Sequence, residues 1–280
     1  MLSPAVQAEI SVIDDTGTTL TLQKPAQRII SLSPGLTELI FSAGGGELLK
    51  GVVSYSDFPD AAKKITNIGN YNAIDLEKIL SLNPDLIVAW ETGSPPLQIS
   101  KLRKLGFNIY ISEPREFDDI SSTILRLGKL MQTEVIAKSN SDKFQKKLQQ
   151  LKLKYPKNKT KTQRVFIQIW DQPLMSINGD HLISKIVHQC NGENIFSGTN
   201  QLTLTIDIET VLKNNPDIII ATKQGKLGDS WLNRWKQWHF LAAVKNNTLY
   251  KINPDHVVRH TPRVLKGIEQ VSEYINMEHS

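Results

Sequence analysis

A duplication inside the chain constrains its fold more than any other feature. Residues 74–89 read IDLEKILSLNPDLIVA, and residues 206–221 read IDIETVLKNNPDIIIA. Nine of the sixteen positions are identical, and four more exchange one aliphatic residue for another. Two copies are too few for a solenoid, which needs at least three stacked repeats. The 280 residues are therefore predicted to form two related lobes.

Each copy predicts the same unit of secondary structure. Asp75 and Asp207 are expected to cap a two-turn helix, and the Asn-Pro-Asp that follows ends it before an apolar strand. Short buried strands are expected at 28–32, 51–55, 85–90, 107–111 and 164–170. Continuous apolar strands that alternate with helices are typical of parallel sheets covered on both faces. The predicted fold class is α/β, with two Rossmann-like lobes joined by one long helix.

The predicted domains follow from the segments around the repeats. Residues 9–133 form the N-terminal lobe, which begins with a hairpin at 9–22, and 156–280 form the C-terminal lobe. Residues 134–155 carry apolar residues at helical spacing and predict a bridging helix of about 30 Å, stiff enough to favour small opening angles. Val6-Gln7-Ala8 has small residues where a signal peptidase cleaves, so 1–8 is interpreted as the remnant of an export signal, or else as an ordinary N-terminus.

Composition excludes several classes of protein. A net charge of +5 without a dense Lys/Arg block gives no reason to expect nucleic acid. No apolar stretch approaches the 18 residues of a transmembrane helix. One cysteine excludes an internal disulfide and a Cys-based zinc site. Gly44-Gly45-Gly46 matches no phosphate-binding motif and is interpreted as the turn at the end of a helix.

Aromatic residues are expected where predicted strands end. Tyr55, Trp90 and Trp170 each end a strand, and Tyr71 precedes the first repeated helix. A single aromatic at such a place is usually a lid on the core. Three of them, drawn from both lobes, favour a flat apolar ligand held in a cleft between the lobes.

Asp255 and Arg259 follow a strand at 248–252 and are four residues apart. They form either a ligand-binding pair at the end of a sheet or an ordinary surface ion pair. His256 and His260, with Asp255 beside them, have the spacing of two imidazoles on one helical face for a metal. His181, His188 and His239 have no companion ligand nearby in the sequence, and no metal site is expected.

Two further patterns have more than one interpretation. Trp231, Trp235 and Trp238 have the spacing of a helix that packs on a core, with a stacking platform as the alternative. Glu77 and Glu209 occupy equivalent places in the first turns of the repeated helices. Each carboxylate stabilises a positive helix end, or the two together face a two-fold symmetric partner.

The chain resembles the single-helix-hinged class of periplasmic substrate-binding proteins, which serve ABC importers of cobalamin, haem and siderophores. The resemblance covers about residues 9–275 and is greatest to the cobalamin-binding members. Six segments carry it: RIISLSPGLTELIFSAG at 28–44, VVSYSDFP at 52–59, IDLEKILSLNPDLIVAW at 74–90, CNGENIF at 190–196, IDIETVLKNNPDIII at 206–220 and PDHVVRHTPR at 254–263.

The resemblance implies a monomer exported to the periplasm, without catalysis, cofactor or metal, that hands cobalamin or a related corrinoid to the dimeric permease of an ABC importer in the inner membrane. The ligand-binding residues expected are Pro34, Gly35, Tyr55, Tyr71, Trp90, Trp170, Asp255 and Arg259. By the same resemblance, Glu77 and Glu209 match the two carboxylates that dock onto arginines of the permease.

The chain also departs from the familiar cobalamin binder. Thr203 and His256 stand where that protein has aromatics, Tyr71 stands where it has a tryptophan, and Ser272 replaces a second cysteine, which leaves Cys190 unpaired. Tyr71 and His256 would suit haem or another iron chelate, so haem or a ferric siderophore is the alternative ligand. An enzyme of two Rossmann-like lobes, such as a glycosyltransferase, is not expected, because the chain has no nucleotide-phosphate loop and no paired acid and base.

Overall fold

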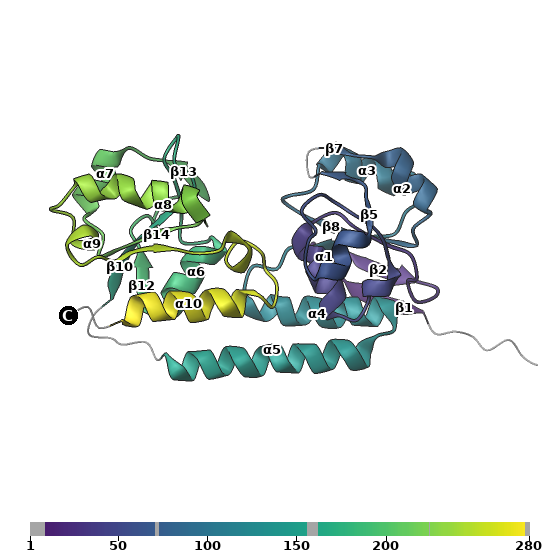
Figure 1. Cartoon of the computed structure of the whole chain (residues 1–280). Coiled ribbons are helices and arrows are strands. Elements are labelled where there is room, and N and C mark those ends of the chain that lie inside the picture. The colour runs from purple at the N-terminus through teal and green to yellow at the C-terminus, as the bar shows by residue number, and fades with distance from the viewer. Residues whose placement is uncertain (1–8, 71–72, 156–161, 224, 278–280) are drawn as a thin grey trace, which may run out of the picture. The chain divides into compact units, whose positions relative to one another are not determined.

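The computed structural model describes residues 9–70, 73–155, 162–223 and 225–277 (Figure 1). The chain forms two compact units, Met1–Gln145 (unit 1) and Lys146–Ser280 (unit 2). Each unit has a parallel sheet with helices packed on it, which confirms the predicted α/β class. The finer division at 9–133, 134–155 and 156–280 stays a prediction, and residues 1–8 lie outside the described part of the chain.

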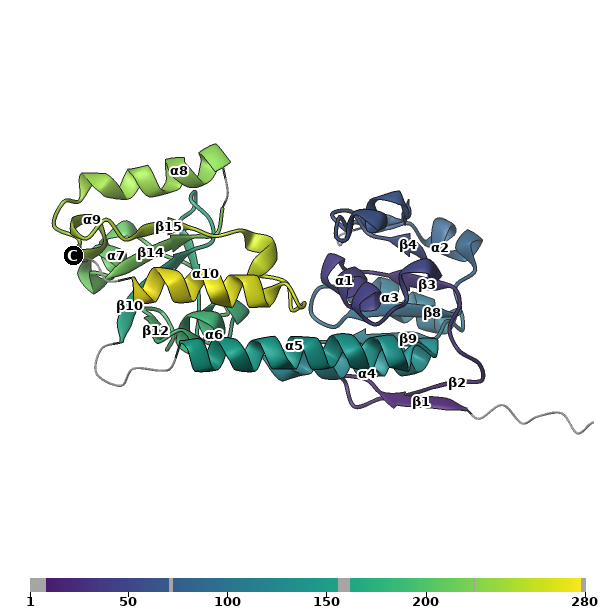
Figure 2. The same ribbon diagram turned by 60° about the horizontal axis from the view of Figure 1, so that its bottom comes forward.

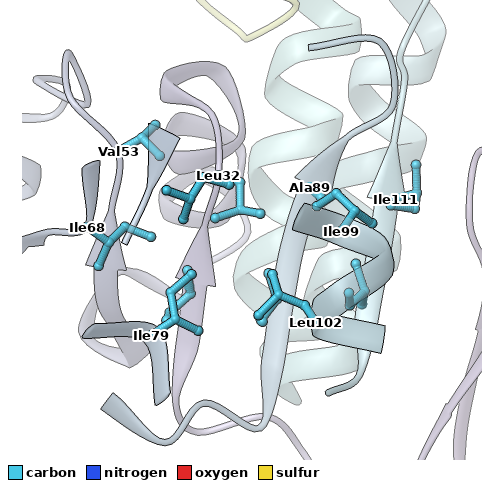
Figure 3. Close-up of a cluster of buried hydrophobic side chains, with 12 residues drawn as sticks. Leu32, Val53, Ile68, Ile79, Ala89, Ile99, Leu102 and Ile111 are labelled. Atoms are coloured by element: carbon cyan, nitrogen blue, oxygen red, sulfur yellow. The ribbon is translucent and has the colours of Figure 1, made fainter. Parts of the chain in front are cut away.

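The sheet of unit 1 has the strand order β5-β4-β3-β8-β9, and all its neighbours are parallel. Its strands are β3 (Ile29–Ser31), β4 (Leu49–Val52), β5 (Thr66–Asn67), β8 (Leu86–Trp90) and β9 (Ile109–Ser112). Ile87 and Ala89 belong to a core that also contains Ile79 and Leu102 (Figure 3). The alternate residues Leu86 and Val88 point to the other face and are equally buried, which is why β8 reads as a continuous apolar run.

Helices cover both faces of this sheet. They are α1 (Pro34–Ser42), α2 (Leu76–Leu82), α3 (Pro96–Lys104) and α4 (Phe117–Met131), with the short turns η1 (Gly46–Leu48) and η2 (Asp60–Lys64) and the strand pair β6 (Gly69–Asn70) and β7 (Ala73–Ile74). Ile79 of α2 and Leu102 of α3 pack on one face, and α1 packs against β3, β8 and α4 on the other. Gly44 follows Ala43, the C-cap of α1, and has a φ of +88°, which confirms the predicted helix-ending turn.

The predicted hairpin is present as β1 (Ile10–Ile13) and β2 (Thr19–Leu22). Its turn is closed by Asp14, whose Oδ1 accepts hydrogen bonds from the backbone N–H groups of Thr16 and Thr18. The turn also binds β9, because Asp15 N donates to Ile111 O at 3.1 Å and Asp15 Oδ2 accepts from Glu113 N at 2.6 Å. The hairpin therefore satisfies backbone groups of the edge strand β9.

Unit 2 has a parallel sheet in the order β12-β10-β14-β15 and an antiparallel pair, β11-β13. The strands are β10 (Gln163–Gln168), β11 (Met175–Ile177), β12 (Gly192–Asn194), β13 (Thr203–Thr205), β14 (Ile218–Ala221) and β15 (Leu249–Lys251). The helices are α6 (Leu182–Gln189), α7 (Ile208–Asn214), α8 (Gly225–Asn233), η3 (Arg234–Gln237), α9 (Ala242–Lys245), η4 (Pro254–His256) and α10 (Val264–Asn276). Figures 1 and 2 show α8 on one face of β14 and β15, with α6 and α10 on the opposite face.

The two copies of the repeat fold alike. Asp75 Oδ1 accepts from Lys78 N at 2.9 Å, and Asp207 Oδ1 accepts from Thr210 N at 2.6 Å, so both predicted N-caps are confirmed. Asn83 and Asn215 then end α2 and α7 with φ values of 45° and 43°. This left-handed conformation is tolerated by asparagine, and it turns the chain toward the next strand.

The likeness continues beyond the repeated residues. Ile29 of β3 pairs with Leu86, and Val165 of β10 pairs with Ile218, which is the equivalent position of the second copy. The aspartate before each of these partners accepts a hydrogen bond at 2.9 Å from the residue that leads into the central strand. The pairs are Arg28 N with Asp85 and Arg164 N with Asp217. The duplication therefore fixes the register of both sheets.

One long helix, α5 (Glu134–Lys154), fits the predicted helix at 134–155. Phe144, Leu148 and Leu151 are buried at helical spacing, whereas Val135 and Leu153 are more than three-quarters exposed. The apolar spacing of the sequence thus identified the helix, although not every apolar residue lies on its buried face.

The tryptophan stripe packs on the core of unit 2, as predicted. Trp231 and Trp235 are buried, and the rings of Trp235 and Trp238 lie 5.4 Å apart. The expected continuous helix is wrong, because α8 ends at Asn233 and a 3₁₀ turn carries Trp235. Trp235 Nε1 donates to the buried Gln168 Oε1 at 2.9 Å, which joins this turn to β10.

His181 makes the stability of unit 2 sensitive to acid. It caps α6, where Nδ1 accepts from Ile183 N at 3.2 Å, and burial lowers its pKa to about 4. Because the folded state favours the neutral imidazole, its stability is highest above about pH 6.5, where His181 is neutral in both states. Stability is lost as the pH falls from about 6.5 toward about 4, where only the unfolded state binds a proton. We expect the free energy of unfolding to drop by about 2 kcal/mol between pH 7 and pH 5.

Urea unfolding at the two pH values measures this loss. His181→Asn keeps an N-cap acceptor that does not titrate, so most of the loss should disappear in that variant. An equal loss of stability in the wild type and in His181→Asn would contradict the assignment of this pH dependence to His181.

Candidate ligand-binding site

The carboxyl ends of β4, β3 and β8 meet at one edge of the sheet in unit 1, and predicted site residues gather there. Pro34 and Gly35 begin α1 just after β3, Tyr55 follows β4, and Trp90 is the last residue of β8. In open parallel sheets this edge is where ligands bind. The predicted Tyr71 lies outside the described residues.

Tyr55 does not end a strand, which corrects the predicted strand at 51–55. β4 stops at Val52, because Ser54 N donates to Gly69 O at 2.8 Å and Ser56 N closes a turn onto Val53 O. Tyr55 stands in this turn with a φ of +67° and is 74 % exposed. Trp90, at 39 % exposure, is also far more open than a core aromatic such as the fully buried Tyr110. These exposures disfavour the interpretation of both rings as core lids.

Buried hydroxyl groups form a hydrogen-bond network at this edge. Thr37 Oγ1 of α1 lies 2.9 Å from Ser31 Oγ at the end of β3 and 3.2 Å from Ser56 Oγ in the turn after β4. Ser31 Oγ in turn donates to Ser33 O at 3.0 Å. The network joins the loops that carry Pro34 and Tyr55, and it holds them in one arrangement.

The carboxyl edge of the sheet in unit 2 gathers the remaining site residues. Trp170 follows β10, and Asp255 and Arg259 follow β15, with β14 between these strands. The predicted strand at 164–170 is too long. β10 ends at Gln168, and Trp170 instead makes an antiparallel bridge to Met175.

Trp170 is held by its neighbours while half of its surface stays exposed. Its Nε1 donates to Gln172 O at 3.1 Å, and its ring meets that of Trp231 edge-on with centroids 6.0 Å apart. The loop that carries it is fixed by Asp171, which accepts from Arg234 at 2.7 Å. The indole of Trp170 is therefore held in place by Gln172 and Trp231 and remains half-exposed at this edge.

Asp255 and Arg259 form an ion pair at 3.0 Å without the helix that their spacing suggests, because η4 ends at His256. Arg263 Nη1 lies 3.7 Å from the same carboxylate. The side chains of Arg259 and Arg263 are only 14 % and 11 % exposed. Such burial is unlike an ordinary surface ion pair, where both charged ends remain in water.

His256 and His260 do not share a helical face, so the spacing argument for a metal site is wrong. Within the described residues, no group of three His, Cys, Asp or Glu side chains is placed to hold a metal ion. Val258 N still donates to Pro254 O at 2.8 Å, as in one helical turn. Residues 257–263 then lead into α10 outside any helix, and they bring Arg259 and Arg263 to Asp255.

Glu77 and Glu209 are both exposed in the first turns of α2 and α7. Neither carboxylate forms an ion pair with another residue in the part of the chain that the structure describes. The two carboxylates are therefore exposed at equivalent places in the two copies.

Cys190 is buried and unpaired, as the sequence indicated. Ser272 Oγ of α10 lies 3.0 Å from its Sγ, so the residue that replaces the expected second cysteine does face the thiol. Burial raises the pKa of the Cys190 thiol to about 12, which keeps it protonated and unreactive at neutral pH.

The sequence also placed Arg263 beside Arg259 at the predicted cleft, and the structure brings its side chain to Asp255. Sequence reasoning did not assign Gly93 and Ser94, which lie against Trp90. Gly93 comes three positions after an aromatic residue that ends a strand. This spacing is the one sequence signal that could have indicated a contact between Gly93 and Trp90.

Comparisons with known proteins identify the family of the chain. Residues 29–256 match the model of the periplasmic binding protein family. The vitamin B12-binding protein of Vibrio cholerae is 35 % identical over 254 residues, which are 90 % of each chain. The chain belongs to the periplasmic binding protein family, and none of the helices in its described ranges could cross a membrane.

Solved structures show the same fold. The periplasmic vitamin B12 binding protein of Vibrio cholerae superposes with a TM-score of 0.83 at 35 % identity, over 90 % of this chain and 97 % of that one. A possible iron-binding protein of Staphylococcus epidermidis gives 0.78 at 26 % identity, over 91 % and 100 %. A periplasmic haem-binding protein of Roseiflexus gives 0.77 at 19 % identity, over 89 % and 98 %, which is a likeness of fold alone.

Proposed function

We propose that this protein captures cobalamin or a related corrinoid in the periplasm and delivers it to an ABC importer. The observation that carries the proposal is the 35 % identity to a vitamin B12-binding protein over 90 % of both chains. The exposed rings at the two sheet edges support it, because a corrin ring is broad and has large apolar faces.

The two edges together supply two kinds of contact, stacking and hydrogen bonding. Tyr55 and Trp90 of unit 1 and Trp170 of unit 2 would stack on the ring of the ligand. Asp255 offers acceptors and Arg259 a forked donor, which together suit the amide groups around a corrin. Pro34 and Gly35 add a small-residue surface that lets the ligand approach the start of α1.

The test of ligand identity is a panel offered to the purified protein after export. Cyanocobalamin, haem and a ferric siderophore are each added, and the bound ligand is identified by absorbance and mass after gel filtration. We expect retention of cyanocobalamin and no retention of the other two. A retained haem band that is lost in His256→Ala would favour the haem alternative instead.

Delivery to the importer is proposed to use Glu77 and Glu209. Both are exposed at matching places in the two copies, so they suit a partner that presents two equivalent basic surfaces. Stabilisation of the helix ends alone does not require this exposure, since Asp75 and Asp207 already cap the helices.

A further inference from the structure

The loop that follows β8 holds the indole of Trp90 directly over Gly93. A Cβ atom on Gly93 would lie 2.7 Å from Cδ2 of that ring and would overlap Cε3 and Cζ3. Real side-chain carbons do not approach this closely, so any larger residue at 93 must displace the ring. The backbone of Gly93 is therefore the surface on which one face of the indole rests.

The same loop is fixed by hydrogen bonds between Trp90 and Ser94 and by further hydrogen bonds to the end of β9. Trp90 N donates to Ser94 Oγ at 2.9 Å, and Ser94 N donates back to Trp90 O at 2.9 Å. Glu91 N donates to Ser112 O at 3.2 Å, and Thr92 N donates to Glu113 Oε2 at 3.1 Å. Ser94 is only 4 % exposed, which shields its bonds to Trp90 from competition with water.

Together these contacts leave the ring little freedom. One face is supported by Gly93, and the backbone at its root is fixed by Ser94, while 39 % of the residue stays open at the sheet edge. A free side chain would lose rotamer entropy on stacking against a ligand. A ring that is already fixed avoids most of that loss.

We infer that Gly93 and Ser94 are positioning residues that hold the Trp90 indole as a preformed flat surface for the ring of the ligand. This inference rests on the proposed function, because it assigns the ligand contact to Trp90. It predicts that affinity for a flat ring system depends on residues that do not touch the ligand. Fixing one side chain corresponds to roughly a tenfold change in affinity.

The test is calorimetric titration of cyanocobalamin into Gly93→Ala. We expect a Kd about tenfold weaker than that of the wild type, with a melting temperature within about 2 °C of it. Gly198→Ala is the matched control, because a Cβ there meets open space, and its Kd should not change. Ser94→Ala removes the acceptor of Trp90 N and should weaken binding in the same direction.

A double-mutant cycle separates positioning from a general structural effect. In a Trp90→Ala background, Gly93→Ala should have no further effect on Kd, because there is no ring left to displace. An equal loss in both backgrounds, or a wild-type Kd for Gly93→Ala, would overturn the inference. Failure of the wild type to bind cyanocobalamin would instead overturn the proposed function.

Discussion

Oxidised Ser272→Cys protein is expected to unfold about 10 °C above its reduced form. Ser272 Oγ lies 3.0 Å from Cys190 Sγ, and both residues are buried. A new sulfur at 272 would therefore face the existing thiol, and the two sulfurs would have to approach by roughly 1 Å to form a disulfide of about 2.05 Å. The loop closed by the bond spans 82 residues (272 minus 190), for which loss of chain entropy in the unfolded state is worth about 4.5 kcal/mol as an upper value.

The pKa of Cys190 sets the conditions of this experiment. Because burial raises that pKa to about 12, the folded thiol is almost entirely protonated and would react slowly with an oxidant. The variant is therefore oxidised during export or refolding, and the bond is verified by mass. Melting is then compared with and without a thiol reductant.

Ser272→Ala is the control for this variant. It removes the hydroxyl without adding a cross-link, so it should lower stability by about 1 kcal/mol and show no response to reductant. Equal melting temperatures for the oxidised and reduced cysteine variant, with the bond confirmed, would contradict the packing of α10 against Cys190.

Reversal of the charge of both Glu77 and Glu209 should strongly reduce transport without changing ligand affinity. We expect Glu77→Arg combined with Glu209→Arg to reduce uptake at least tenfold in vesicles that contain the importer. Both side chains are exposed, and like charges facing a basic partner repel it. The Kd for the ligand should stay within twofold, because the site residues at the sheet edges are untouched.

The matched control reverses exposed glutamates elsewhere, one in each unit. Glu47→Arg combined with Glu193→Arg makes the same change in net charge at sites outside the repeated helices. Uptake by this control should resemble the wild type. Equal loss of uptake in both double variants would mean that net charge, rather than the position of the two carboxylates, governs delivery.

Local signals made much of the fold predictable. Asp75 and Asp207 each precede a short helix that ends at Asn-Pro-Asp, and cap, stop and strand are encoded within sixteen residues. Because the sequence repeats, two copies support the same prediction of a capped helix followed by a strand. The pairing of Ile29 with Leu86 and of Val165 with Ile218 then follows from the same duplication.

The ends of strands were less predictable, because contacts distant in sequence decide them. Tyr55 lies in a turn since Ser54 binds the carbonyl of Gly69, and no pattern at 51–55 encodes that bond. β10 ends early because Trp170 bridges to Met175. An apolar run predicts that a strand exists, whereas its last residue depends on tertiary partners.

The site was predictable in part for the same reason. Trp90 ends β8 and Trp170 follows β10, so topology alone directs both to the sheet edges. The burial of Arg259 and Arg263 around Asp255 arises from the packing of the segment before α10, without helical periodicity. The contact between the Trp90 ring and Gly93 forms only in the folded chain, and no sequence pattern shows which face of a ring lies on a backbone.

The central claim is that this chain binds cobalamin through the rings at its sheet edges. Within that claim, Trp90→Ala should weaken binding at least tenfold, because it removes a large preformed apolar contact. Leu153→Ala changes an 80 % exposed residue of α5, and it should leave the affinity unchanged.

The most direct measurement is a calorimetric titration of cyanocobalamin into the wild-type protein freed of ligand. The proposed function predicts one site per chain with a Kd of about 1 μM or tighter, which corresponds to about −8 kcal/mol. No binding heat at several temperatures and at high micromolar ligand, in protein shown to be folded, would contradict it.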